Sequence, residues 1–347
     1  DEFIADIELV ADSLRANKGR HGGLFAVRRL LRRARTFGFY IATVDIRQNA
    51  LVHRRVIGEA LQESHWLNVD DEHCDGVRVA VFQTIAHCRR KYGREAIGPY
   101  IVSMAHGPDD VLSVLLLAKW GHLGTKGEAV PLDVAPLFET GEDVERAPRI
   151  MERLLGDAMY REHLRARGDH QIVMLGYSDS HRDGGIAAAR WSLQKAEQEL
   201  VGVMARHGVA LTVFHGRGST LSRSGGALHE GVLAAPRGAI TGRVRLTEQG
   251  EHVNTKYGLR GIALRTLEQM LSAVLLVTCR PPPAIPDEPR WQAIMEEIAV
   301  ASREAYQALL SDPSDFMEYF RAATPIDVIE RVGSRSERTE PKAISPP

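Results

Sequence analysis

Short β-type runs alternate with longer amphipathic stretches along the first two thirds of the chain. Apolar residues concentrate in five runs and a weaker sixth, at residues 38–46, 100–104, 134–138, 172–177, 209–214 and 242–247. Between these runs apolar residues recur at three- and four-residue steps, as in residues 109–120, 143–155 and 187–207, which predicts amphipathic helices. Strand followed by helix followed by strand predicts parallel pairing with right-handed crossovers.

The pattern changes in the last third of the chain. From Leu259 onward it predicts helices only, interrupted by a proline-rich break from Arg280 to Pro289. Residues 335–347 are polar and then proline-rich without periodicity, which is typical of a tail. We therefore expect residues 1–334 to form part of a larger single domain. The absence of an initial Met suggests that the chain begins inside a longer protein.

Polar and charged residues follow each predicted strand. Asp45-Ile46-Arg47, Ala105-His106, Glu139-Thr140 and the run from Ser178 to Asp183 come after the first four strands, and His215-Gly216-Arg217 comes after the fifth. A (β/α)8 barrel places its active site at this end of its strands. Each residue alone has a simpler interpretation, since Thr140, for example, is a good N-cap for the next helix.

The glycine-rich segment from Phe214 to Gly226 is the strongest candidate for ligand binding. It combines one His, two Arg and four Gly in thirteen residues. Glycine lets backbone N–H groups approach a ligand, and the planar fork of arginine binds phosphate or carboxylate. The segment lacks the P-loop pattern and predicts an anion site for a phosphorylated substrate, the alternative being a flexible surface loop.

Two carboxylates, Glu139 and Asp179, are expected to meet at the same end of the sheet. Two carboxylates with water and a substrate oxygen suit Mg²⁺ or Mn²⁺. The alternative is that one is a helix cap and the other an ion-pair partner. Four arginines would surround the ligand, and like charges 4 Å apart repel by roughly 4 kcal/mol at an effective dielectric constant of about 20. An anionic ligand would relieve that repulsion; the four are Arg47, Arg182, Arg217 and Arg223.

Composition excludes several classes of function. Lys and Arg number 44 against 45 Asp and Glu in 347 residues, so charge predicts neither a nucleic-acid partner nor an anionic membrane surface. The apolar run from Val111 to Ala118 is too short to cross a bilayer. Three cysteines (Cys74, Cys88 and Cys279) fit a reducing cytoplasm. The His73-Cys74 and His87-Cys88 pairs lack zinc-site spacing.

The order of these motifs resembles the phosphoenolpyruvate carboxylases over nearly the whole chain. The matching segments include GFYIATVDIRQN (38–49), YIVSMAHGPDDVLSVLLL (100–117), VAPLFETGEDVERAPRIMERLL (134–155), IVMLGYSDSHRDGG (172–185) and TVFHGRGSTLSRSGG (212–226). The resemblance implies an α/β fold, an incomplete (β/α)8 TIM-type barrel with about six strands and many additional helices. It also implies the reaction of phosphoenolpyruvate and bicarbonate to oxaloacetate and phosphate, through carboxyphosphate and an enolate stabilised by the metal.

The same resemblance implies a role for each candidate residue. Glu139 and Asp179 would bind Mg²⁺ or Mn²⁺, and Arg47 and Arg217 would bind the substrate phosphate. Arg182 and Arg223 would be catalytic, with Arg223 on a mobile loop near bicarbonate. The family also implies a cytoplasmic, allosteric homotetramer that replenishes the tricarboxylic acid cycle.

Three departures from the family pattern leave alternatives open. Arg182 replaces a lysine of the YSDSxKD motif, and Ser219 and Ser224 stand where the glycine-rich loop usually has Gly. The family's N-terminal TAHPTE segment, with its acid–base His, and its C-terminal part are not in this sequence, so the chain alone is expected to be inactive. The competing interpretation is a degenerate carboxylase-like scaffold that binds anions. Another enzyme acting on phosphoenolpyruvate is disfavoured by the YSDS and FHGRG motifs.

Overall fold

The computed structural model describes residues 2–39, 42–63, 80–124, 128–216, 227–248, 250–281, 283, 285–311 and 313–328. The chain forms two compact units. The first contains Asp1–Ser180 and Ser192–Pro283, and the second contains His181–Trp191 and Ala284–Pro347. The expected tail at 335–347 lies outside the described residues, so the predicted boundary at residue 334 stays a prediction.

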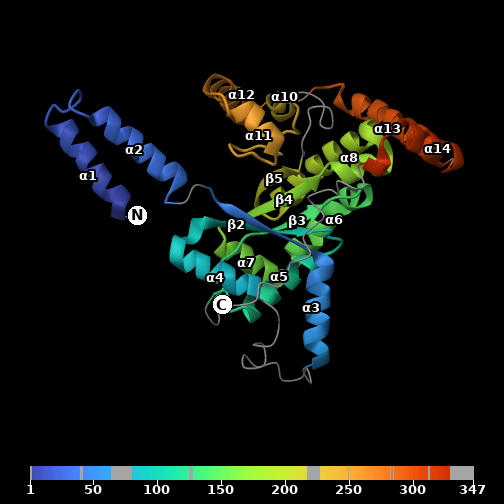
Figure 1. Cartoon of the computed structure of the whole chain (residues 1–347), viewed down its shortest axis with the longest axis horizontal. Helices are drawn as coiled ribbons and strands as arrows, with labels where there is room; N and C mark the ends of the chain where they lie inside the picture. Colours follow the sequence, from blue (N-terminus) through green and yellow to red (C-terminus); the bar gives the residue numbers. More distant parts are fainter. Residues whose placement is uncertain are drawn as a thin grey trace. The chain divides into compact units, whose positions relative to one another are not determined.

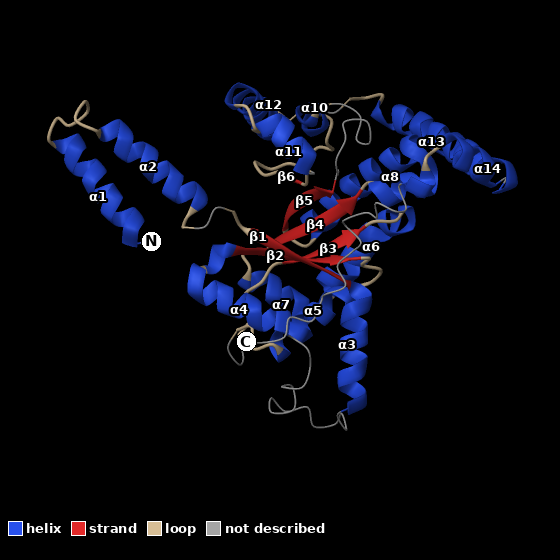
Figure 2. Ribbon diagram, viewed as in Figure 1, coloured by secondary structure: helices blue, strands red, loops and turns tan. Residues whose placement is uncertain are grey.

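The centre of the first unit is a curled, parallel sheet that forms half of a barrel (Figures 1 and 2). Its strands follow one another in chain order, and every neighbouring pair is parallel. The α/β class and the parallel pairing are therefore confirmed. The strands are β1 (Val44–Asn49), β2 (Ile97–Ser103), β3 (Val134–Phe138), β4 (His170–Gly176), β5 (Ala210–Gly216) and β6 (Arg245–Leu246).

Helices connect the strands and continue beyond them. The helix α8 contains a break at Gly185, whose φ is 75°. The second unit consists of the residues around that break, α13 and α14. The described helices are α1 (Glu2–Ala16), α2 (Leu24–Phe37), α3 (Ala50–Glu63), α4 (Ala80–Tyr92), α5 (Pro108–Trp120), α6 (Gly141–Gly156), α7 (Ala158–Ala166), α8 (Ser178–Arg206), α10 (Leu228–Leu233), α11 (Gly250–Tyr257), α12 (Arg260–Cys279), α13 (Glu288–Ser311) and α14 (Pro313–Ala323), with a 3-10 turn at Arg94–Ala96.

The main core lies between the outer face of the sheet and its helices. Helices α4, α5 and α7 lie along one side of the strands in Figure 2. Val102, Phe138 and Leu175 face this core, whereas Ile101, Leu137 and Met174 form a smaller apolar cluster on the opposite face. Successive residues of a strand point to opposite faces. Strand β3 is buried along its whole length because both of its faces are covered.

A third apolar cluster joins α10 to α12 around Val232, Ile240 and Ala273. Helix α12 carries exposed leucines, including Leu264, Leu267, Leu271 and Leu275. Among the described helices, α12 is long and apolar enough to cross a bilayer by length and composition alone, a property that core helices of soluble proteins share. It is longer than the apolar run at 111–118, which alone is too short to cross a bilayer.

The sequence placed most elements correctly, with shifts at their ends. The first strand begins at Val44 and not near residue 38, because α2 extends to Phe37. The weak sixth strand shrinks to two residues, and α8 begins at Ser178, nine residues before the predicted start. The helical character expected from Leu259 onward is confirmed for the described residues.

A long-range ion pair links the first and last strands of the sheet. Arg245 Nη2 on β6 lies 2.6 Å from Asp45 Oδ2 on β1, although 200 residues separate them. The guanidinium also lies 4.9 Å from the ring centroid of Phe214. This pair can form only because the sheet curls enough to bring its two edge strands within reach of each other.

A bulge in β2 makes room for Asp45. The register passes from Val44 opposite Ile97 to Ile46 opposite Tyr100, so Gly98 and Pro99 together face Asp45. Proline has no N–H to lose from the ladder, and glycine leaves space, which is why both are tolerated at a bulge. A Cβ at residue 98 would lie 2.2 Å from Asp45 Oδ1.

Replacing Gly98 with alanine should therefore destabilise the protein. The new methyl group must displace Asp45 from Arg245, and we expect a loss of about 1–3 kcal/mol in the free energy of unfolding. Urea denaturation measures the change. Gly58→Ala is the matched control, because no atom lies within 4 Å of a Cβ at that position of α3 and alanine should stabilise the helix by about 0.5–1 kcal/mol. Equal changes in the free energy of unfolding for Gly98→Ala and Gly58→Ala would show that the bulge does not constrain Asp45.

His53 is a buried histidine in the main core. Its Nε2 lies 2.8 Å from the Tyr100 hydroxyl, and Tyr100 stacks on Phe82 with ring centroids 5.2 Å apart. Burial lowers the pKa of His53 from its ordinary 6.5 to about 4, although Asp110 opposes that shift. The folded protein therefore keeps this imidazole neutral at a pH where the unfolded chain protonates it.

This difference predicts acid sensitivity. Between about pH 6.5 and 4 the unfolded state binds a proton at His53 that the folded state does not, so stability falls as the pH falls. Between pH 7 and 4.5 the unsubstituted protein loses free energy of unfolding, and His53→Gln should make that loss smaller by about 2.5 kcal/mol. Urea midpoints at both pH values test this, with exposed His21→Gln as the control. His163, whose pKa is also lowered to about 4, remains in both variants. An unchanged pH dependence in His53→Gln would contradict the assignment.

Candidate functional site

The ends of the first three strands converge on the carboxylate of Glu139. Arg47, on the inner face of β1, places Nη2 2.6 Å from Glu139 Oε1. The backbone N–H of Met104, just after β2, donates to Glu139 Oε2 at 3.1 Å. Glu139 itself directly follows β3, and its side chain is 13 % exposed against 53 % for Arg47. Two of the predicted site residues are thus brought into direct contact.

Met104 adopts an unusual backbone conformation at this point. Its φ is 55°, in the left-handed region that residues other than glycine rarely adopt. This turn points its amide at Glu139. Strain of this kind persists only where surrounding contacts hold it, and it occurs often at functional sites.

The strand ends next to Glu139 approach unusually closely. A Cβ on Gly176, the last residue of β4, would lie 2.9 Å from the Cα of Glu139 and 3.2 Å from the carbonyl oxygen of Phe138. Gly176 pairs with Gly216, the last residue of β5. Gly176 therefore leaves the backbone of β4 without a side chain next to Glu139, and Gly216 does the same for β5 next to β4.

The remaining predicted residues are distributed more widely. Asp179 lies on the first turn of α8, three residues after the end of β4, and is partly exposed. Arg182 also lies on α8 but belongs to the second compact unit. Arg217 and Arg223, with the glycine-rich loop, lie outside the described residues. In the described part of the chain, no group of three or more His, Cys, Asp or Glu side chains is arranged to hold a metal ion, so the metal pair stays a prediction.

The structure adds a histidine–aspartate pair that the sequence analysis did not select. His106, in the loop after β2, places Nδ1 2.7 Å from Asp143 Oδ1 on α6. Thr140 caps α6 as expected, accepting from the Asp143 N–H at 3.1 Å. The signal in the sequence was the position of His106 directly after a strand.

His215 has a supporting position at the end of β5. Its Nδ1 lies 3.0 Å from the Tyr177 hydroxyl, and its Nε2 lies 3.7 Å from Glu197 Oε1. Only 10 % of its side chain is exposed. Tyr177 and Glu197 belong to the segments after β4, so His215 fixes the end of β5 to them.

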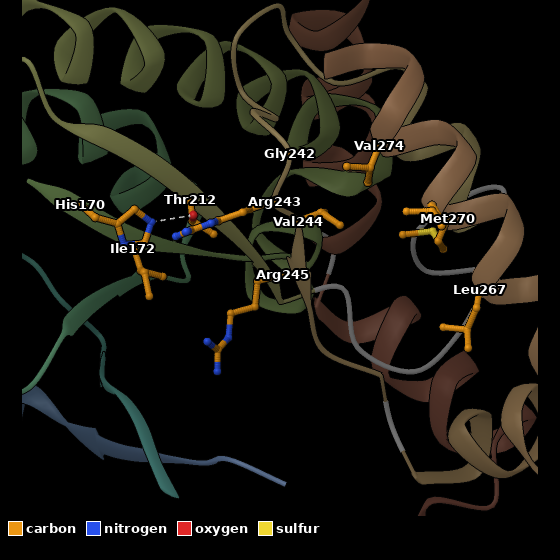
Figure 3. A pocket seen from close by; sticks show the side chains of 11 residues that line it. His170, Ile172, Thr212, Gly242, Arg243, Val244, Arg245, Leu267, Met270 and Val274 are labelled. Carbon is orange, nitrogen blue, oxygen red and sulfur yellow. Dashed lines mark hydrogen bonds between the residues drawn. The ribbon is translucent and has the colours of Figure 1, made fainter. Parts of the chain in front are cut away.

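A separate cavity of about 540 Å³ lies at the opposite ends of the strands. Figure 3 shows Arg243 beside His170 and Thr212, Arg245 pointing away from them, and Met270 and Val274 of α12 on the other side. His170 Nε2 lies 2.8 Å from Thr212 Oγ1. Burial and then the neighbouring Arg243 lower the pKa of His170. Since His170 begins β4 and Arg245 begins β6, this cavity is distinct from the site around Glu139.

Comparison with known proteins identifies the family. The phosphoenolpyruvate carboxylase family model matches residues 1–74 and 60–345. The chain belongs to the phosphoenolpyruvate carboxylase family. It is 49% identical over 360 residues to the phosphoenolpyruvate carboxylase of Xanthomonas campestris pv. campestris (strain 8004), covering 97% of this chain and 40% of that protein. It is 34% identical over 374 residues to the phosphoenolpyruvate carboxylase of Nitrosomonas eutropha, covering 98% of this chain and 40% of that protein.

The chain thus spans about 40% of the length of these curated relatives. A phosphoenolpyruvate carboxylase of Pseudomonas putida (strain KT2440) is 39% identical over 334 residues, which is 88% of this chain and 37% of that protein. The family membership expected from YSDS and FHGRG is confirmed. Arg47 and Glu139 therefore lie within the part of the chain that these longer relatives share.

The contact between Arg47 and Glu139 can be measured by a double-mutant cycle. We expect Arg47→Met and Glu139→Gln to show a coupling energy of about 0.5–1 kcal/mol, because one partner is half-exposed and the other mostly buried. Urea denaturation of the four proteins provides the value. The exposed Arg146–Glu142 pair, at 2.8 Å on α6, serves as the control and should give about 0.3–0.5 kcal/mol. Zero coupling at Glu139 would show that this contact does not form in solution.

Proposed function

We propose that this chain carries the phosphate- and metal-binding part of a phosphoenolpyruvate carboxylase. In the full-length protein the reaction would join phosphoenolpyruvate and bicarbonate to give oxaloacetate and phosphate, through carboxyphosphate and an enolate. The observation that supports this most is the convergence of Arg47 and Glu139 at the strand ends in a chain of this family. A (β/α)8 barrel carries its active site at that end.

Arg47 suits the role of a phosphate ligand. Its side chain is 53 % exposed, so its guanidinium is accessible from solvent while Glu139 orients it. Guanidinium groups bind phosphate oxygens as a planar fork. Such groups position the substrate and stabilise the charge that develops during phosphoryl transfer. Arg217, outside the described residues, is proposed as the second phosphate ligand by its FHGRG motif.

Glu139 and Asp179 fit a hard divalent cation such as Mg²⁺ or Mn²⁺. Both supply carboxylate oxygens, the donors that these ions prefer. The bare backbone at Gly176 keeps a side chain away from Glu139. When bound, the ion would supply Lewis-acid stabilisation of negative charge on a substrate oxygen. The residues of this chain would hold the anion and exclude water around it.

The catalytic arginines complete the proposal. Arg182 occupies the position of the family lysine, and Arg223 belongs to the glycine-rich segment that would close over the ligands. Arginine keeps the positive charge but is larger and forked, so the exchange at residue 182 is not conservative at a tight site. This departure is the specific observation that favours the second candidate, a degenerate carboxylase that binds its anion without turnover.

The proposal extends to the whole protein. The curled six-strand sheet supports a closed TIM-type barrel in the longer chain, with the missing strands supplied by other segments. A cytoplasmic, allosteric homotetramer that feeds the tricarboxylic acid cycle, without a nucleic-acid or membrane partner, follows from the family resemblance and stays a prediction.

Oxaloacetate formation, coupled to malate dehydrogenase, tests the proposed function. We expect turnover by the full-length protein and none by residues 1–347 alone, because positioned acid–base groups outside this chain typically contribute about 10²–10⁴-fold in rate. Asp179→Asn in the full-length protein should abolish metal-dependent turnover.

Three results would change the conclusion. Activity of the isolated chain near that of the full-length protein would show that the mechanism is misassigned. Retained activity in Asp179→Asn would exclude this residue as a metal ligand. An inactive full-length protein that Arg182→Lys restores would establish the degenerate carboxylase, and one that stays inactive would reject the carboxylase reaction.

A further inference from the structure

The pair formed by His106 and Asp143 connects the ends of β2 and β3. His106 follows β2 by three residues, and Asp143 lies in the first turn of α6, which follows β3. The 2.7 Å contact joins Nδ1 of the imidazole to Oδ1 of the carboxylate. The contact from Met104 to Glu139 joins the same two strand ends.

Asp143 is held firmly in place. Its side chain is only 4 % exposed. Its second oxygen, Oδ2, accepts a hydrogen bond from the Thr140 hydroxyl at 2.7 Å and a longer one from the Thr140 N–H at 3.4 Å. A buried carboxylate that receives several hydrogen bonds can act only as an acceptor when ionised. The imidazole must therefore present N–H at Nδ1.

The backbone of His106 is fixed as well. Its N–H donates to Asp110 Oδ2 at 2.8 Å, and the N–H of Gly107 donates to the same oxygen at 3.2 Å. Asp110 is fully buried and pairs through Oδ1 with Arg54 at 2.8 Å. The orientation of the ring thus rests on two buried carboxylates, which limits its motion.

In its neutral form, an imidazole that donates from Nδ1 to Asp143 keeps its lone pair at Nε2. In a neutral imidazole one nitrogen donates and the other accepts, and here Asp143 takes the donor. The His106 side chain is 46 % exposed, so its outer edge is accessible. Arg47, at the same end of the strands, can only donate hydrogen bonds. By contrast, Nε2 of the neutral His106 ring is an acceptor held in a fixed orientation.

An acceptor of this kind recognises an anion that still carries a hydroxyl. Bicarbonate has one negative charge and one O–H, whereas phosphoenolpyruvate at alkaline pH offers acceptor oxygens only. Arginine side chains bind either anion, because they recognise charge and acceptor oxygens. A lone pair at Nε2 distinguishes the two.

We propose that His106 is a specificity-determining residue whose Nε2 accepts a hydrogen bond from the hydroxyl of bicarbonate, with Asp143 as its positioning residue. This inference rests on the proposed carboxylase function. It adds a ligand contact at a residue outside the candidate set of Arg47, Glu139, Asp179 and the other arginines. It includes no proton transfer, since the contact orients the bicarbonate and leaves its hydroxyl intact.

The test uses the full-length protein and measures KM separately for bicarbonate and phosphoenolpyruvate. His106→Asn keeps a donor near Asp143 but lacks Nε2, so it should raise the KM for bicarbonate about 5- to 10-fold, the worth of one lost hydrogen bond. The KM for phosphoenolpyruvate should change less than about 2-fold. His106→Gln, whose amide oxygen can replace Nε2 as an acceptor, should recover part of the loss.

A matched control lies at the C-terminal end of α8. His207 Nε2 lies 2.7 Å from Glu152 Oε1, the same length as the contact of His106, but at the C-terminal end of α8. His207→Asn should leave both KM values unchanged. The ring tautomer is read independently by long-range ¹H–¹⁵N correlation in residues 1–347, where we expect His106 to carry its proton on Nδ1 and Asp143→Asn to disturb that state.

The outcomes separate the two proposals. An active full-length protein in which His106→Asn changes neither KM, or raises both equally, would overturn the role of His106 and leave the carboxylase function standing. A proton on Nε2 in the unsubstituted chain would overturn it as well. A full-length protein that forms no oxaloacetate, with or without Arg182→Lys, would reject the carboxylase function and the bicarbonate contact together.

Discussion

One carboxylate, that of Glu139, organises the functional end of the half-barrel. Its two oxygens receive Arg47 from β1 and the Met104 amide from the end of β2, while its own backbone continues β3. Gly176 lets the end of β4 come within van der Waals distance of the same residue. The ends of β1, β2 and β3 therefore meet at this side chain, and the end of β4 packs against the same residue. His106 and Asp143 lie on the two loops that it joins.

A second ion pair maintains the curvature at the other end of the strands. Asp45 and Arg47 are two residues apart on β1, so both face the interior, where Asp45 meets Arg245 and Arg47 meets Glu139. The bulge at Gly98 and Pro99 admits the first contact. Without the curl, Asp45 on β1 and Arg245 on β6 would be too far apart to form their ion pair. The residues on the inner face would then face solvent, as on one side of a flat sheet.

The sequence predicted the order of the elements because strand–helix alternation is a local pattern. Because polar residues follow each strand, it also predicted that Arg47 and Glu139 lie at the same end of the sheet, where the structure brings them into contact. It missed the beginning of β2, since Gly98 and Pro99 look like strand breakers and their function as a bulge depends on Asp45 opposite. It also assigned Arg47 and Glu139 to different ligands, whereas the structure pairs them. His106 was visible only as a residue after a strand, because its partner Asp143 is 37 residues away.

The pairing of Arg47 with Glu139 constrains how this chain can bind ligands. Removing Arg47 from a carboxylate that is 13 % exposed would leave a mostly buried charge without its partner, which is costly. An anion that draws Arg47 away therefore needs a cation to replace it at Glu139. Equally, a cation at Glu139 releases the guanidinium for an anion. If the proposed function holds, joint binding of a divalent ion and an anionic substrate would be favoured over binding of either one alone, because each would supply the charge that the other displaces.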